Sequence, residues 1–293
     1  MIVLLQKTFF LFAICCITVG CYSLEKKYNY GEPYQTSPDL WTEDDPQFES
    51  GVEYQILDDI GNYIFSIPSK LILMSWRLND HKISDATKQT MQNYIRENNL
   101  RDVKVRFNQY APISELKRIW RNDSINPIVK YSFGLLGWFV YAVLPERLFA
   151  GLLGGDHYNP FSNSIHLYSN VPAIAIHEGG HAKDFNQRKY KTLYAGIYSI
   201  PVIGAFYHEA VATDDAIVYF EHNHKNEDID ESYKILVPAY STYVGGSIGE
   251  VVQTPYSIVA VIPGHIYGRY KAWKFRKARR IGEFKNSDHY NED

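Results

Sequence analysis

The sequence predicts an α+β fold for one large domain, and three observations support this class. Residues 70–121 carry an alternating pattern of short apolar runs and amphipathic stretches, typical of strand–helix–strand–helix order. The segment Tyr158–Ser169 then shows two strand-like pieces around a Pro/Ser/Asn turn, which predicts a β-hairpin. A long apolar run follows it from Val171 to Phe185 and is typical of a buried helix.

Residues 1–21 have the layout of a secretory signal. Lys7 is their only charge, an apolar run extends from Thr8 to Gly20, and Cys21 closes the segment. A small residue before a cysteine resembles the bacterial lipobox. That resemblance implies cleavage before Cys21, lipidation of its thiol, and a lipoprotein of the bacterial cell envelope facing the periplasm or the cell exterior. The alternative is an uncleaved N-terminal anchor, for which about 13 apolar residues are short.

Cysteine usage limits the chemistry of the remaining chain. All three cysteines, Cys15, Cys16 and Cys21, lie in the signal region, so we expect neither disulfides nor a thiolate metal site in the domain. Residues 22–50 are polar and rich in Pro, Asp, Glu and Tyr, which predicts a flexible tether. The domain is then expected to span 51–293.

A small α/β lobe is expected over about 51–125. Its predicted elements are a strand Lys70–Trp76, a helix Ser84–Asn98 capped by Ser84, a strand Val103–Gln109 and a helix Ile113–Arg121.

Apolar regions follow at 131–155 and 236–268. Neither is a clean run of about 20 apolar residues, so both buried core helices and a partly membrane-embedded hairpin remain open.

The C-terminal part, 236–293, is expected to add apolar helices and then a basic one, which either lies on anionic lipid or is simply solvated. The net charge of −3 gives no reason to expect a nucleic-acid partner. A mean hydropathy of −0.29 argues against a polytopic membrane protein.

The predicted helix after the hairpin contains the candidate metal ligands and the candidate general base. Asn170 is a good N-cap and Pro172 suits the first turn. His177 and His181 are four residues apart and share a helix face, so both can bind one zinc ion, while Glu178 can act on a water beside it. Two glycines between the histidines indicate close backbone packing or substrate approach.

A third ligand must come from another element, because a catalytic zinc usually has three protein ligands and one open position. Glu209 is the first candidate, since Ala212, Thr213 and Ala216 leave room beside it on a predicted helix. His208 and Asp184 are the alternatives.

The motif His177-Glu178-Gly179-Gly180-His181 with the downstream run from Glu209 to Ala216 resembles the gluzincin type of zinc metallopeptidase. The resemblance covers about 156–221. It implies a zincin-like core, with the active-site helix behind a short β-sheet, and a substrate peptide aligned along the strand Ser164–Ser169. The second motif is similar to the E-x-x-A-D pattern of some membrane-associated peptidases, but Thr213 stands in the place of its Asp. Asp184 or Asp214 would then support the histidines.

The function expected from these residues is metal-assisted peptide hydrolysis, with Glu178 as general base and a membrane-anchored protein acting on peptide or protein substrates. Tyrosines or His265 could stabilise the oxyanion. Two alternatives are a surface lipoprotein that binds zinc without turnover and an inactive peptidase-like interaction module.

Overall fold

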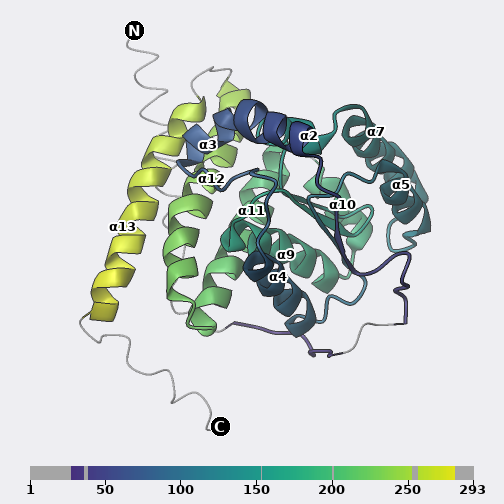
Figure 1. Ribbon diagram of the computed structural model, residues 1–293, viewed down its shortest axis with the longest axis horizontal. Coiled ribbons are helices and arrows are strands. Elements are labelled where there is room, and N and C mark those ends of the chain that lie inside the picture. The colour runs from purple at the N-terminus through teal and green to yellow at the C-terminus, as the bar shows by residue number, and fades with distance from the viewer. Residues whose placement is uncertain (1–27, 36–38, 153, 200, 253–256, 281–293) are drawn as a thin grey trace.

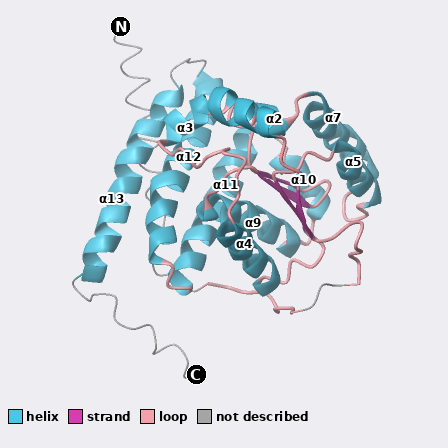
Figure 2. Ribbon diagram, viewed as in Figure 1, coloured by secondary structure: helices cyan, strands magenta, loops and turns pink. Residues whose placement is uncertain are grey.

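The computed structural model describes residues 28–35, 39–152, 154–199, 201–252 and 257–280. Within them the fold is α+β, as predicted: helices surround one small four-stranded sheet (Figures 1 and 2). The predicted signal segment 1–21, including Cys21, lies outside the described residues.

The sheet has the strand order β1-β2-β4-β3. Its strands are β1 (Phe48–Ser50), β2 (Lys104–Phe107), β3 (His157–Asn159) and β4 (Ser164–Leu167). β1, β2 and β4 run parallel, and β3 pairs antiparallel with β4 at one edge of the sheet. The predicted strand within Val103–Gln109 and the predicted hairpin are therefore confirmed.

β2 is buried along its whole length although it carries two cations. Lys104 Nζ lies 2.8 Å from a Glu49 oxygen, and Arg106 lies 3.0 Å from the same carboxylate. Arg106 Nε also donates to buried Glu115 at 2.7 Å. Pairing with carboxylates lets these charges leave water, so charged residues occur in an interior strand.

Short helices and two π-helical turns form the first half of the described chain: α2 (Gln55–Ile60), η1 (Gly61–Phe65), α3 (Ile67–Leu73), α4 (Asp85–Glu97), α5 (Pro112–Arg121), α6 (Pro127–Val129), η2 (Lys130–Gly134), α7 (Leu135–Val143) and α8 (Glu146–Phe149). α4 and α5 confirm the helices predicted there. Ser84 caps α4 as expected, since its Oγ accepts from the Thr87 backbone N–H at 3.3 Å.

Longer helices form the second half: α9 (Pro172–Gln187), α10 (Lys191–Tyr198), α11 (Pro201–His222), α12 (Asn226–Val252), the 3₁₀ turn η3 (Ser257–Ala260) and α13 (Val261–Arg280). α11, α12 and α13 pack in sequence, with α13 on the outside of the molecule (Figure 1). α9 lies beneath the sheet and contacts α11, α4 and α12.

The strand predicted at Lys70–Trp76 is wrong, because most of that segment forms helix α3. Pro68 stands in its first turn, and Lys70 Nζ donates to the Asn62 carbonyl oxygen at 2.7 Å, which ties the helix to η1. A short apolar run is compatible with either a strand or a buried helix, so periodicity could not decide between them.

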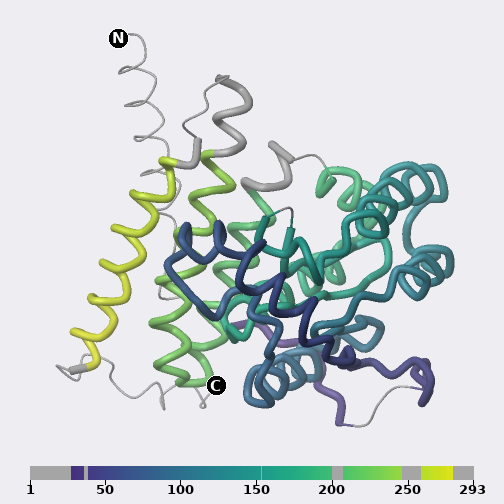
Figure 3. The backbone as a smooth tube through the Cα atoms, turned by 45° about the horizontal axis from the view of Figure 1, so that its top comes forward, coloured from purple at the N-terminus to yellow at the C-terminus, as the bar shows by residue number. Residues whose placement is uncertain are grey.

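The flexible tether predicted for 22–50 is also wrong over its described part. Tyr28 and Tyr34 are buried, and the segment continues into strand β1. Gln47 is 3% exposed and donates to the carbonyl oxygens of Leu100 and Val103. Figure 3 shows this purple segment along the lower part of the domain.

The apolar regions of the sequence form helical structure. Residues 131–155 include η2, α7 and α8, while 236–268 lie mainly in α12 and α13. The part of the chain that the structure describes has no helix that combines the length and the apolar composition needed to cross a bilayer. The C-terminal part therefore contains long helices, as predicted. Among the described residues, these helices are not apolar enough to cross a membrane.

Candidate metal centre

α9 brings the first two candidate ligands into the protein interior. Every residue from Pro172 to Phe185 is buried, as the apolar start of the helix predicts. The N-cap position belongs to Val171, which makes no side-chain cap, so the cap predicted for Asn170 is wrong. Asn170 Oδ1 instead accepts from the hydroxyls of Ser84 and Thr87 at the start of α4.

Two glycines let α9 approach its neighbours closely. A Cβ added at Gly179 would lie 2.5 Å from the Tyr94 ring, and one at Gly180 would lie 3.0 Å from the Ala212 backbone. Close packing with α4 and α11 therefore explains both glycines, which was one of the two interpretations of the sequence. The approach to Ala212 also brings α11 within reach of the histidines.

His177, His181 and Glu209 converge on one point between α9 and α11. His177 Nε2 lies 3.1 Å from Glu209 Oε2, and His181 Nε2 lies 3.5 Å from Glu209 Oε1. The two Nε2 atoms are 3.2 Å apart. The three side chains named from the sequence as metal ligands are thus brought together by the structure.

These separations fit a zinc ion. Bonds of about 2.0–2.1 Å around a tetrahedral ion place its ligand atoms about 3.3 Å apart, close to the three distances above. Thr213 Oγ1 lies 3.3 Å from His177 Nδ1 and so orients the ring from the side away from the cluster. Two imidazole lone pairs and a carboxylate facing one another need a shared proton or a cation to be stable.

The protonation states of Glu209 and His181 also favour metal binding. Burial raises the pKa of the Glu209 carboxyl, but nearby His181 and His177 outweigh it and hold that pKa below its usual range. Burial lowers the pKa of His181, which favours the neutral imidazole that binds metals. The cluster therefore presents an anionic carboxylate beside a neutral ring.

Glu178 lies beside this cluster and does not belong to it. The side chain is buried, and burial, followed by the charge of Glu209, raises the pKa of Glu178 well above its ordinary value. A hydrogen bond from the Tyr158 backbone N–H acts in the opposite direction. Since Tyr158 belongs to the edge strand β3, Glu178 faces both the metal cluster and the edge of the sheet.

Two tyrosines border the cluster, and sequence reasoning did not single them out. The pKa of Tyr243 is raised first by the charge of Glu209, which places this α12 residue near the ligands. The Tyr198 ring packs edge-on against His181 with centroids 5.6 Å apart. His265, the other residue named for oxyanion stabilisation, instead bonds the Ile72 carbonyl at 2.7 Å.

Asp184 lies on α9 about one turn beyond His181, and it contacts His208 of α11. Asp184 Oδ2 accepts from the Tyr194 hydroxyl at 2.7 Å and lies 3.7 Å from His208 Nδ1. Asp184 also pairs with Arg188. The support that Asp184 was expected to give to a ligand therefore goes to His208, which is not part of the metal-binding group.

The residues after Glu209 divide between two faces of α11. Thr213 contacts His177, the contact expected from Asp214 or Asp184. Asp214 raises the pKa values of Tyr233 and Glu221, so its charge acts toward α12.

Asp215 joins three elements behind the metal cluster. It accepts from Lys183 of α9 at 2.8 Å, from Tyr94 of α4 at 2.5 Å, and from Tyr28 of the N-terminal segment at 3.2 Å. Nothing in the sequence pattern marked this residue, because its partners lie 32 to 187 positions away.

Comparison with known proteins adds no assignment. No protein-family model matches the chain, and neither curated proteins nor solved structures gave a match.

Proposed function

We propose that this protein is a zinc-dependent metallopeptidase with a zincin-like core, in which His177, His181 and Glu209 hold the ion. The supporting observation is the convergence of these three side chains at 3.1–3.5 Å. The residues come from two helices, and the spacing suits a tetrahedral cation with one position left for water or substrate.

The proposed reaction is hydrolysis of a peptide bond. When bound, zinc lowers the pKa of water and polarises a carbonyl group. The Glu178 carboxylate takes the proton of the attacking water and later gives it to the leaving amine. Burial and the charge of Glu209 raise the pKa of Glu178, which strengthens it as a proton acceptor for the attacking water.

The edge strand offers a place for the substrate. β3 is an edge strand of the described sheet, where the Tyr158 N–H bonds Glu178 and the Tyr158 carbonyl oxygen accepts from the Tyr198 hydroxyl, so a substrate would replace these contacts. An extended peptide placed along this edge would pass the general base. Tyr243, near Glu209, is the tyrosine best placed to stabilise the oxyanion. We further propose that a lipid at Cys21 anchors the protein to a membrane of the bacterial envelope. Its peptide or protein substrates would then lie outside the cytoplasm.

The test is Glu178→Gln in the full chain. We expect one zinc ion at the His177 cluster to remain, and cleavage of a mixed peptide library to fall by at least about 100-fold, because only the proton acceptor is removed. Elemental analysis gives the zinc content and mass spectrometry gives the cleavage. Exposed Glu227→Gln makes the same chemical change on α12 and should retain full activity.

The alternative function is zinc binding without turnover. Equal activity of the Glu178→Gln variant and the parent would remove Glu178 as the base. A parent that holds zinc at His177 and His181 but cleaves nothing in the library would favour the binding or interaction module.

A further inference from the structure

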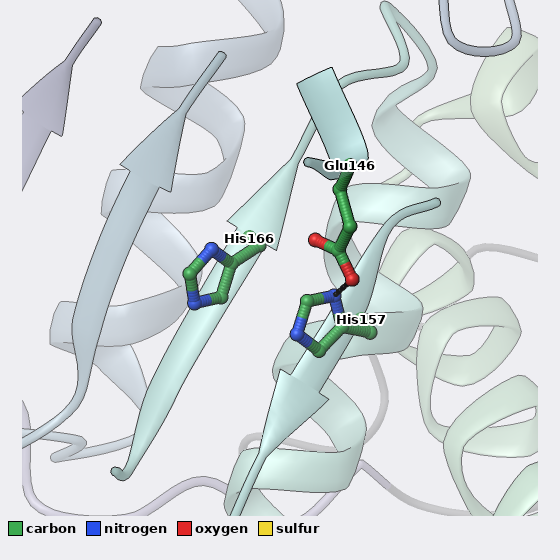
Figure 4. A group of neighbouring side chains, drawn as sticks. All are labelled: Glu146, His157 and His166. Carbon is green, nitrogen blue, oxygen red and sulfur yellow. Dashed lines mark ion pairs between the residues drawn. The ribbon is translucent and has the colours of Figure 1, made fainter. Parts of the chain in front are cut away.

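A second group of ligand-type side chains lies at the edge of the sheet. Glu146 begins α8, His157 belongs to β3, and His166 faces it directly across the β3–β4 pair. One oxygen or nitrogen from each lies within 4.8 Å of the others. Figure 4 shows the Glu146 carboxylate next to the His157 ring, with the contact between them dashed.

Two atoms in this group are buried without a hydrogen-bond partner among the described residues: Glu146 Oε2 and His166 Nδ1. Burying such atoms unpaired is costly, and most proteins avoid it. In Figure 4 the free Glu146 oxygen points toward the His166 ring. The site therefore offers one carboxyl oxygen and one ring nitrogen that have no hydrogen-bond partner within the described part of the chain.

Glu115 prepares His166 for this role. Its Oε2 atom lies 3.3 Å from His166 Nε2, and Arg106 holds the other carboxylate oxygen at 2.7 Å. A carboxylate beside Nε2 favours the tautomer with its proton there, which leaves the lone pair on Nδ1. The same carboxylate–histidine arrangement orients histidine ligands in metal sites.

The protonation states agree with this geometry. Burial lowers the pKa of His166 to about 4, so its ring is neutral near pH 7. Burial raises the pKa of Glu146 to about 7, although nearby His157 acts in the opposite direction.

We propose that Glu146, His157 and His166 bind a second divalent cation of the zinc type, separate from the one at His177 and His181. Two imidazoles and one carboxylate suit zinc better than calcium or magnesium, which prefer oxygen ligands alone. The ion would tie α8 to the β3–β4 hairpin and so fix the strand that faces Glu178. No residue is shared between the two clusters.

Binding requires one ring to turn. The two imidazoles are stacked, with centroids 4.6 Å apart and planes 6° from parallel, so their lone pairs cannot meet at one ion. His157 is the ring that can move, because its side chain is 31% exposed whereas that of His166 is 1% exposed. His157 Nδ1 now lies 3.3 Å from Glu146 Oε1 and 3.1 Å from the Gly155 carbonyl, and cation binding would release it from both.

The experiment counts ions on the purified full chain, stripped with chelator and titrated with Zn²⁺ alone. We expect two ions per chain by elemental analysis after gel filtration. His157→Ala and Glu146→Gln should each leave one ion, and His177→Ala/His181→Ala should also leave one. When Co²⁺ replaces zinc in this last variant, we expect a visible absorption spectrum of the bound ion. The triple variant His157→Ala/His177→Ala/His181→Ala should not show this spectrum.

Matched controls keep the result interpretable. His222→Ala removes an exposed histidine from α11 and should keep both ions. Circular dichroism checks that each variant is folded, and Glu146→Gln preserves the shape of the side chain if His157→Ala is unstable.

The outcomes separate the two sites. One ion in the parent, lost only in His177→Ala/His181→Ala, would overturn the second site and leave the proposed function intact. One ion lost only in His157→Ala would support the second site and overturn the proposed function.

Discussion

The two imidazoles of the metal cluster are held by different contacts. His177 Nδ1 lies beside the Thr213 hydroxyl, whereas buried His181 Nδ1 has no hydrogen-bond partner among the described residues. The His181 ring packs edge-on against Tyr198, and its Nε2 faces His177 and Glu209. His177 is therefore held by a polar contact at Nδ1, whereas the Nδ1 side of His181 is held by packing alone among the described residues.

Glu209 is the ligand whose role is most open to a direct test. Glu209→Ala should weaken zinc binding by roughly 100-fold or more, since loss of a direct ligand exceeds the effect of its outer partners. His208→Ala and Asp184→Ala should weaken it much less, because both side chains face α10. Competition with a fluorescent chelator gives the three dissociation constants.

Thermal unfolding of the metal-free variants serves as the control for Glu209→Ala. Equal affinities for Glu209→Ala and the parent, with unchanged melting temperatures, would remove Glu209 from the ligand set.

The ligands could be predicted from the sequence, but the residues that surround them could not. A four-residue spacing places His177 and His181 on one face of any helix, and the small residues after Glu209 indicated room beside it. Tyr243 lies 34 positions beyond Glu209 on another helix, so only the packing of α11 against α12 reveals it. From the sequence, Thr213 was named as a small neighbour of Glu209 and as a departure from the family pattern, and its contact with His177 was not predicted.

Among the elements, α9 depends on its glycines. Gly179→Ala should destabilise the protein by about 1–3 kcal/mol, because the new methyl group overpacks against Tyr94. The Tyr94 ring cannot easily retreat, since it is fully buried and its hydroxyl bonds Asp215. Urea denaturation followed by fluorescence measures the change.

Gly137→Ala is the matched control for Gly179→Ala. A Cβ at this exposed position of α7 meets nothing within 4 Å, so the substitution should be neutral or stabilise by up to about 1 kcal/mol. Equal effects at both positions would contradict the packing explanation.

The contact between α11 and α12 contains a carboxyl group that should make stability depend on pH. Burial raises the pKa of Glu221 from 4.5 to about 7, and Tyr233 donates to it at 3.3 Å. The folded state then binds this proton more tightly than the unfolded state, so its contribution to stability falls as pH rises from 4.5 to 7.

Glu221→Gln should therefore raise the free energy of unfolding by about 1–3 kcal/mol at pH 8, relative to the parent, and change it little at pH 4.5. The amide oxygen still accepts from Tyr233, so packing is retained. Urea titrations at both pH values give the comparison, and a gain of equal size at pH 4.5 would show that charge is not the cause.

Elements with a clear period or cap were predictable, and those defined by distant partners were not. Ser84 marked the start of α4, and the Pro/Ser/Asn turn marked the hairpin. β1 has three residues and is a strand because β2 lies beside it. No local pattern of that length separates a strand from a tether.

For the whole molecule, the proposed lipid anchor has a specific test. Cys21→Ser should abolish lipid labelling, because the serine hydroxyl does not replace the thiol as the lipidation site. Palmitate labelling and membrane fractionation in a bacterial host measure this. Cys16→Ser is the matched control and should label like the parent; unchanged labelling of Cys21→Ser would exclude the lipobox.

The described N-terminal segment has consequences for how the chain folds. Tyr28 lies beside Tyr219 and bonds Asp215, while β1 pairs with β2 more than 50 residues later. These contacts cannot form until most of the chain has emerged, and contacts of such long range slow folding. We therefore expect the helices α9 to α12 to gather first and the N-terminal segment to close over them last. A polypeptide exported in an unfolded state, as a secretory signal implies, would complete this closure only after release on the far side of the membrane.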